Sequence, residues 1–192
     1  MPERNDAALD FFLTRRSRPA KTLTTPVPNR EELAPILEAA LRTPDHGKLE
    51  PWRLVVLEKA ALVRLGDLAG ERATALGLDE VQTEKGRNQF DNGALAVAVI
   101  ESPVDSPKVP VIEQTYSAGA VCLALLNAAL ASGWGANWLT GWPSHDREFL
   151  EKGFGLAKHE RIAGIIHIGT EKFAPPERPR PNQEEKVTWQ SE

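Results

Sequence analysis

The hydrophobic pattern of the chain is strongest from Tyr116 to Thr140, YSAGAVCLALLNAALASGWGANWLT. Residues 117–131 are almost all small or apolar, with Asn127 as the one strongly polar residue among them, so apolar residues occur on every side of a predicted helix. A helix of this kind must be covered all round. We therefore expect a buried central helix, covered within one chain or shared with a second copy, that passes Gly133 into a core strand at 134–140.

Three other segments have the pattern of strands. Ala94–Ile100, ALAVAVI, is almost continuously apolar, as expected of a strand buried on both faces. Ile162–Ile168 is a second buried strand, and Trp52–Leu57, WRLVVL, is a third. Lys186–Gln190 has the composition of a small terminal strand.

The polar and apolar spacing of the N-terminal part predicts two helices. The first is expected to be capped by Asp6, to have Leu9, Phe12 and Leu13 as its apolar positions, and to end before Pro19. The second is capped by Asn29, with Glu32 at the reciprocal position. Further helices are predicted at 58–69, within the polar segment 71–92, which we interpret as a cover or lid, and at 145–155.

The order of these elements predicts an α+β or α/β fold with a mixed sheet, built as one domain over residues 1–192. Residues 174–181, APPERPRP, cannot form a packed element and are expected to run extended. We therefore expect 174–192 to form a C-terminal arm. Two interpretations of the arm remain open, namely that it reaches a partner's sheet edge or that it is a frayed tail.

Composition narrows the class of protein. An apolar content of 41% and a charged content of 26% are ordinary for a globular domain. The net charge of −4 argues against a surface that coats nucleic acid, and the run at 117–131 is short for a membrane span. The N-terminus is too charged for a secretory signal, so we expect a cytoplasmic protein. Cys122, the single cysteine, cannot form an intrachain disulfide.

Standard catalytic motifs are missing from the sequence. It contains no phosphate-binding loop, no dinucleotide fingerprint, no HExxH and no GxSxG. The four histidines lack metal-site spacing, so we predict no metal. Two segments are rich in polar donors. In the first, Arg15, Arg16 and Ser17 have two interpretations, namely cations that stabilise the end of a helix through its dipole or an anion clamp, and the spacing alone favours the helix dipole. The second is the irregular loop at 42–52.

Taken in order, several segments resemble the nitroreductase family, specifically its small YdjA-like branch. They are Arg15-Arg16-Ser17, residues 42–47 (RTPDHG) followed by Pro51-Trp52, Ser117-Ala118-Gly119, Gly133-Trp134-Gly135, residues 138–141 (WLTG) and Ile168-Gly169-Thr170. The resemblance covers nearly the whole chain. It implies a three-layer α/β/α fold with a mixed, mostly antiparallel central sheet, and a homodimer with two FMN sites at its interface.

The resemblance also assigns roles to residues. Arg15, Arg16 and Ser17 match the segment that holds the FMN phosphate and ribityl chain, which favours the anion clamp. Arg42 and His46 match positions that reach the flavin across the dimer interface. Trp138, Leu139 and Thr140 match the segment along the ring edge. Three more cations, Lys48, Arg178 and Arg180, are anion partners by charge and location alone.

The implied activity is an oxidoreductase that passes hydride from NADH or NADPH through FMN to electron-poor acceptors such as nitroaromatics or quinones. Because the flavin carries the chemistry, no catalytic side chain or metal is required. Two alternatives remain open. One is a flavoenzyme of the same fold with a dedicated metabolite or a dehalogenation substrate, and the other is a flavin-binding protein without enzymatic activity.

Overall fold

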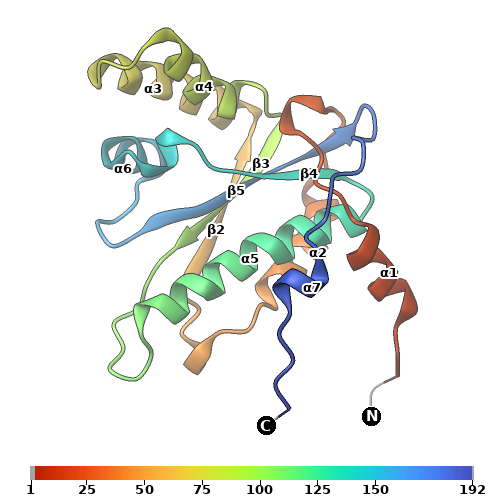
Figure 1. Ribbon diagram of the computed structural model, residues 1–192. Coiled ribbons are helices and arrows are strands. Elements are labelled where there is room, and N and C mark those ends of the chain that lie inside the picture. The colour runs from red at the N-terminus through yellow and green to blue at the C-terminus, as the bar shows by residue number, and fades with distance from the viewer. Residues whose placement is uncertain (1–2, 192) are drawn as a thin grey trace.

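The apolar segments form a five-stranded sheet in the computed structural model, which describes residues 3–191 (Figure 1). At its centre β3 (Leu95–Glu101) is buried at every position and pairs with β2 (Trp52–Glu58) on one side and β5 (Arg161–Glu171) on the other. The remaining strands, β1 (Leu23–Thr24) and β4 (Gly135–Leu139), both pair with β5. Every strand pair in the described part of the chain is antiparallel, so the predicted mixed sheet is purely antiparallel there.

Helices cover both faces of the sheet, which gives three layers (Figure 1). On one face lie α2 (Arg30–Leu41) and α5 (Val111–Ala131), packed on Val97, Val99 and Ile166. On the other face lie α3 (Lys59–Ala75), α4 (Glu80–Asp91) and α6 (Arg147–Phe154), packed through Leu62, Phe90 and Phe149. The two clusters confirm the predicted α+β fold with three layers. Outside them are α1 (Asp6–Thr14), α7 (Gln183–Lys186) and short 3-10 turns at Ala20–Thr22, His46–Lys48 and Trp142–His145.

Local chemistry explains where the helices begin. The Asn29 side chain accepts from the Glu32 amide at 3.0 Å, and the Glu32 carboxylate accepts from the Asn29 amide at 2.9 Å, which confirms the predicted capping box of α2. For α1 the prediction was one residue late. Asn5 is the cap, since its side chain accepts from the Ala8 amide at 3.0 Å, and Asp6 is the first helical residue.

The central helix α5 is buried along one side only. Val121, Cys122 and Leu125 are fully buried against the sheet, and burial raises the pKa of the Cys122 thiol to about 12. The opposite side forms a stripe, defined as Ile112, Tyr116, Ala120, Leu123 and Asn127, in which the first four residues are exposed and Asn127 is half-buried. In the part of the chain that the structure describes, α5 is also the one helix long and apolar enough to cross a membrane, with 44% of the relevant window buried in the fold. The sequence predicts that α5 is covered on every side, and a single chain covers only one of its sides.

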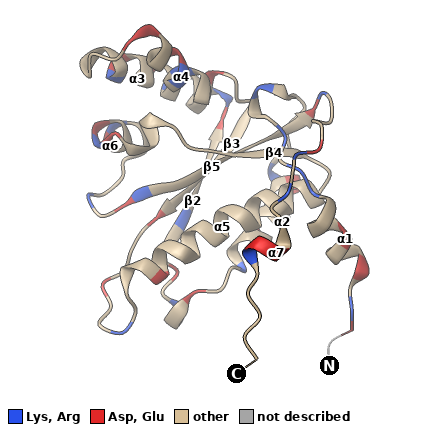
Figure 2. Cartoon of the chain, in the orientation of Figure 1, with Lys and Arg blue, Asp and Glu red and all other residues tan. Residues whose placement is uncertain are grey.

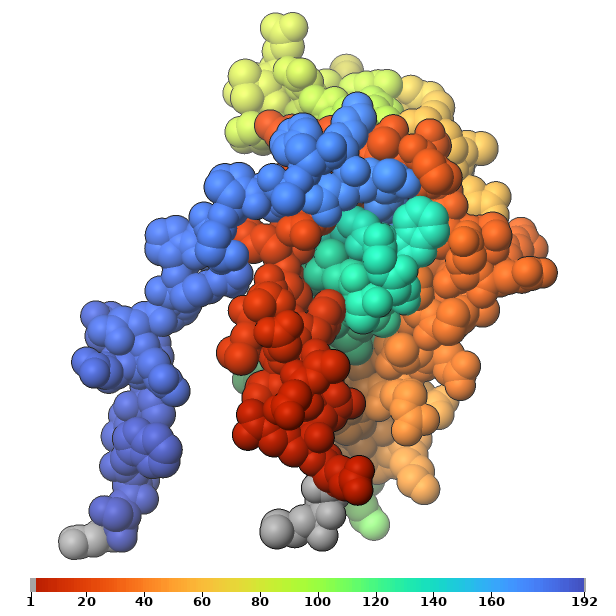
Figure 3. Space-filling model, turned by 90° about the vertical axis from the view of Figure 1, so that its right-hand side faces the viewer, coloured from red at the N-terminus to blue at the C-terminus, as the bar shows by residue number. Residues whose placement is uncertain are grey.

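The C-terminal arm leaves the body of the molecule. Residues 174–181 have no regular structure, as predicted, and α7 follows them. In Figure 3 the arm descends beside α1 with open space between the two. The predicted strand at 186–190 is absent from these described residues, because the single chain offers it no neighbouring strand, and Trp189 is 90% exposed. Glu192, the last residue of the predicted arm, lies outside the described residues.

Candidate functional site

The segment that follows α1 is a turn of four residues, Arg15–Arg18, called here the arginine turn. Within it an Arg15 Nη2 group donates to Ser17 Oγ at 3.0 Å, which orients the hydroxyl beside the guanidinium. The Arg18 amide donates to the Ala136 carbonyl at 2.8 Å. The Arg18 side chain pairs with Glu171 Oε2 at 2.5 Å. Both contacts fasten the arginine turn to the sheet, at the start of β4 and the end of β5.

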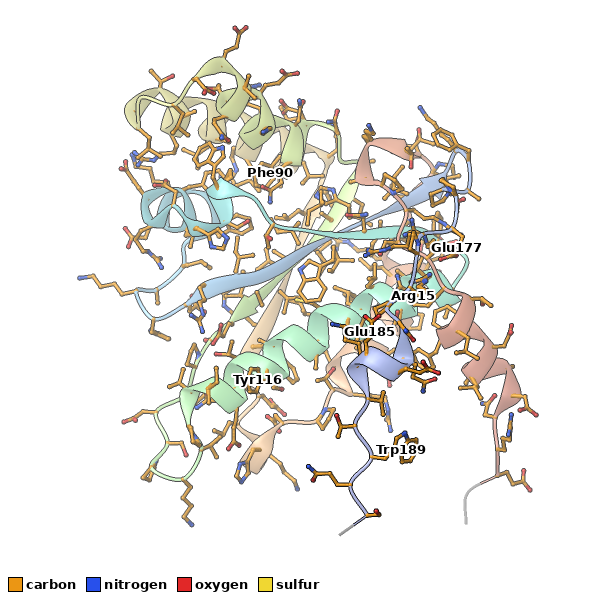
Figure 4. All side chains as sticks on the ribbon, in the orientation of Figure 1. Arg15, Phe90, Tyr116, Glu177, Glu185 and Trp189 are labelled. Atoms are coloured by element: carbon orange, nitrogen blue, oxygen red, sulfur yellow. The ribbon has the colours of Figure 1, made fainter. Side chains whose placement is uncertain are left out.

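The arm adds cations to this turn. Arg16 Nη2 donates to the Pro176 carbonyl at 3.2 Å, and Figure 4 shows Arg15 near Glu177 of the arm. Partial burial, then the charges of Arg180, Arg16 and Arg18, lower the pKa of Arg15. The Nε groups of Arg15 and Arg16 are buried and have no hydrogen-bond partner among residues 3–191. Clustered guanidinium groups with unpaired donors form a site suited to an anion.

A cavity of about 820 Å³ opens beside the arginine turn. Its walls come from the arginine turn and the residues after it, from α4, from β4 and the turn that follows, from β5, and from the arm. The lining residues are Arg16, Ser17, Pro19, Ala20, Lys21, Gln82, Lys85, Asn88, Gln89, Asn92, Asn137, Leu139, Thr140, Gly141, Trp142, His167 and Arg178. The volume lies in the range of pockets that hold small ligands and cofactors.

The alternation of β4 decides which of its residues reach this cavity. Asn137 and Leu139 line it, as does Thr140 just after the strand. Trp138 points to the opposite face, where its indole packs on Gly164 so closely that a Cβ there would lie 2.1 Å from Trp138 Nε1. The structure therefore brings Arg16, Ser17, Leu139 and Thr140 together around one cavity. The side chain of Trp138 lies on the α5 face of the sheet.

Arg42 and His46 do not lie at this cavity within the same chain. His46 Nδ1 is 2.6 Å from Glu113 Oε2, at the N-terminal end of α5. The arginine turn lies near the other end, because α5 leads through Gly133 into β4. A helix of 21 residues is about 30 Å long. The two predicted groups of cofactor residues are thus separated by the length of α5.

The loop that carries Arg42 and His46 is held firmly. Trp52 Nε1 donates to Ser117 Oγ at 3.0 Å, and that hydroxyl donates to the Pro44 carbonyl at 3.0 Å. Lys48 and Glu50 have φ angles of 56° and 47°, which are uncommon for residues other than glycine. Strained backbone that the surrounding contacts maintain is found more often at functional sites than elsewhere.

Helix α4 forms one wall of the cavity, whereas the sequence predicted only a cover or lid for this segment. Lys85, Asn88, Gln89 and Asn92 line the cavity, and their spacing of three or four residues puts them on one helix face. Trp142 Nε1 donates to the Gln82 carbonyl at 3.0 Å, and its ring packs on Gly86. The spacing of these four residues is visible in the sequence, but a polar helix face is usually exposed to solvent, so the spacing did not indicate a binding site. Among the described residues there is no group of three or more side chains that could hold a metal ion.

Comparison with known proteins gives a consistent result. A protein-family model described as Nitroreductase family matches residues 13–170. The chain is 33% identical over 163 residues to the Escherichia coli (strain K12) protein named "Putative NAD(P)H nitroreductase YdjA", which covers 85% of this chain and 87% of that protein. It is 36% identical over 166 residues to the Haemophilus influenzae protein named "Putative NAD(P)H nitroreductase", and the match covers 85% of this chain and 88% of that protein.

Solved structures share the fold. A nitroreductase-like protein from Bacillus cereus superposes with a TM-score of 0.78 at 23% identity, over 100% of this chain and 99% of that chain. A Desulfovibrio desulfuricans protein solved in complex with FMN superposes with a TM-score of 0.73 at 19% identity, over 97% and 98%. At these identities the superpositions establish the three-layer fold alone.

Proposed function

This chain belongs to the nitroreductase family, and from that premise we propose that it is an FMN-dependent oxidoreductase. It takes reducing equivalents from NADH or NADPH and delivers them to small electron-poor acceptors such as nitroaromatics or quinones. FMN supplies the hydride chemistry, accepting and donating at its ring, while the protein binds, orients and shields it.

The observation that carries the proposal is the arginine turn at the mouth of the 820 Å³ cavity. The unpaired Nε groups of Arg15 and Arg16 and the Ser17 hydroxyl are the donor set that a phosphate dianion requires. Arg178 lines the same cavity from the arm. Partial burial and, after it, repulsion from the neighbouring guanidinium groups lower the pKa of Arg15, and a bound anion would offset both. The residues present therefore fit the phosphate end of FMN.

The rest of the cavity fits the other end of the cofactor. Leu139 and Thr140 supply an apolar side chain and backbone groups along the end of β4. Lys85 and Asn88 supply a cation and an amide from α4, and a cation beside the ring favours its reduced, anionic form. Trp142 lines the cavity where α4 meets the turn after β4.

We propose that the functional unit is a homodimer in which α5 packs on α5 of a second copy. The stripe of Ile112, Tyr116, Ala120, Leu123 and Asn127 is apolar apart from its last residue, and in Figure 2 α5 is almost entirely free of charge colours. Tyr116 is 69% exposed and Leu123 is 47% exposed. A continuous exposed apolar stripe on a central helix is typical of a subunit interface.

This assembly accounts for the two separated groups of cofactor residues. Within one chain the loop that carries Arg42 and His46 contacts the N-terminal part of α5, a helix about 30 Å long, and the arginine turn lies near its other end. An antiparallel α5 pair would bring those residues of one copy beside the arginine turn of its partner. We propose that each FMN site takes Arg15, Arg16, Ser17, Leu139 and Thr140 from one chain and Arg42 and His46 from the other.

We further propose that residues 1–192 form one domain whose arm, 174–192, contacts the partner. The arm stands away from its own body (Figure 3), and Val187 and Trp189 on it are exposed. Strand β2 is an edge of the sheet with unpaired backbone groups, and an apolar groove of about 1,270 Å³ lies between β2 and α2. An edge of this kind accepts an extended segment from another chain.

Anaerobic stopped-flow absorbance tests the proposed activity. FMN-loaded protein mixed with NADH or NADPH is expected to lose its flavin absorbance near 450 nm, and a nitroaromatic or quinone is expected to restore it. Reduction followed by no reoxidation with either class would support a dedicated metabolite or a dehalogenation substrate instead. Bound FMN that neither nicotinamide reduces would contradict the enzymatic proposal.

A further inference from the structure

Two buried polar side chains at the floor of the cavity have hydrogen-bonding groups with no partner. His167 on β5 is 2% exposed and Gln89 on α4 is 7% exposed. Gln89 Oε1 and both ring nitrogens of His167 have no hydrogen bond among the residues that the structure describes. Leaving such a group unsatisfied is costly, so native structures rarely do it without a ligand or a bound water.

Both residues line the cavity, and close packing against glycine fixes the orientation of their side chains. The His167 ring lies against Gly93, where a Cβ would come within 2.9 Å of His167 Nδ1. The Gln89 amide is oriented by its Nε2 group, which donates to Ser144 Oγ at 3.2 Å. That leaves Gln89 Oε1 facing Gly141, where a Cβ would lie 2.5 Å from it. Both packing contacts depend on glycine.

The pair is uncharged. Burial lowers the pKa of His167 to about 4, so near neutral pH its ring carries one N–H donor and one acceptor nitrogen. Gln89 Oε1 adds an acceptor. Neither residue suits a phosphate, and the described residues offer no metal-ligand cluster here. The chemistry matches a flat, neutral group whose edge alternates donors and acceptors.

Gln89 lies away from the phosphate end, and His167, which pairs in register with Asn137 in the middle of β4, lies between Gln89 and that end. The arginine turn contacts β4 at its start, through Ala136, whereas Gln89 faces Gly141 beyond the end of the same strand. The span of β4 from Gly135 to Leu139 is roughly 14 Å at the usual rise of a strand. FMN likewise carries its phosphate at one end and, on its ring, a pyrimidine edge with carbonyl acceptors on either side of an N–H donor.

We propose that Gln89 and His167 are positioning residues that hydrogen-bond the pyrimidine edge of the FMN ring, Gln89 Oε1 accepting and the His167 ring donating. The inference rests on the proposed function. It assigns a role to two residues that no sequence motif singled out. It also predicts that the pair acts on the ring, independently of the phosphate.

Riboflavin, which lacks the phosphate, separates the two ends of the site. Apoprotein variants Gln89→Met and His167→Leu, each checked for fold by circular dichroism, are titrated with FMN and with riboflavin. We expect each variant to bind both flavins about 5- to 10-fold more weakly, because one hydrogen bond to the ring is lost in each case. The matched variant Arg16→Ala should weaken FMN binding and leave riboflavin binding unchanged.

A second measurement covers a variant that fails to fold. His167→Gln keeps a donor near the position of the ring nitrogen, so this variant should recover most of the flavin affinity. Gln89→Glu places a negative charge beside the ring, so it should lower the reduction potential of bound FMN. Wild-type affinity for riboflavin in folded Gln89→Met and His167→Leu would overturn this inference alone. A wild-type protein that takes up neither flavin would overturn the proposed function with it.

Discussion

The Arg18 amide donates to the Ala136 carbonyl at 2.8 Å, and this contact sets the geometry of the site. It joins the turn after α1 to the first residues of β4, which are more than a hundred positions later in the chain. The turn thus presents Arg16 and Ser17 to the same cavity as Leu139 and Thr140. The arm completes the group, since Arg16 also contacts the Pro176 carbonyl.

Replacing Arg15 tests the anion clamp. Arg15→Ala removes a cation and the donor to Ser17 Oγ, so we expect FMN to bind about 10- to 100-fold more weakly, as for the loss of one charge-assisted contact. The apoprotein should keep its melting temperature, because the change also relieves repulsion from Arg16 and Arg180. Arg4→Ala, at a 76% exposed side chain just before α1, is the matched control. Equal FMN affinity in both variants would remove the assignment.

A charge on the exposed stripe of α5 tests the interface. Leu123→Asp should give a folded monomer, because Leu123 is 47% exposed in the single chain but would be buried against a partner. Val63→Asp on α3, at a residue 43% exposed, should remain dimeric. The same charge at Leu125, which is fully buried, should unfold the protein. Size-exclusion chromatography with light scattering measures the oligomeric state of all three variants. A dimeric Leu123→Asp protein would show that this stripe is not the dimer interface.

Mixed dimers test whether the site is shared. Chains carrying Arg15→Ala and chains carrying His46→Ala are given different tags, co-expressed and purified as the mixed species. If His46 acts on the partner's cavity, one site of the mixed dimer is intact and the other doubly impaired. FMN titration should then show half of the sites with wild-type affinity. Two equally and singly impaired sites would mean that Arg15 and His46 serve the same chain's cavity.

The buried imidazole of His167 predicts a dependence of stability on pH. Its pKa is lowered from 6.5 to about 4, so between these values the unfolded chain binds more protons than the native one. Stability should therefore fall as the pH falls from about 6.5 to 4, by on the order of 3 kcal/mol in all. Glu160, whose pKa is lowered to about 2 mainly by its hydrogen bond from Arg53, contributes only below about pH 4.5. Urea unfolding of the apoprotein at pH 7 and pH 5 should show this slope, and His167→Gln should lose it.

Elements determined by local chemistry were predictable from the sequence. The capping box at Asn29 and Glu32 is satisfied by neighbours three residues apart, and the unbroken apolar run of β3 needed only burial on both faces. The strand predicted at 186–190 was wrong for the isolated chain for the opposite reason. A strand needs a partner strand, and none lies beside the arm.

The site was predictable only in part. The family resemblance identified Arg16, Ser17, Leu139 and Thr140, which the structure places at one cavity. It could not reveal that α4 builds the opposite wall, because Lys85 and Asn88 look like any solvated helix face. The sequence did not indicate His167 as a site residue, because a single histidine within an apolar strand is usually interpreted as a buried core residue. Its unpaired nitrogens became visible only with the cavity beside them.

Sedimentation velocity recorded at both protein and flavin wavelengths tests the central claim most directly. The account predicts that FMN absorbance at 450 nm sediments with a single species of twice the 21.1 kDa chain mass, with one FMN per chain. Flavin that sediments with a 21.1 kDa monomer, or that remains unbound while the protein sediments, would contradict a site assembled from two copies around the arginine turn.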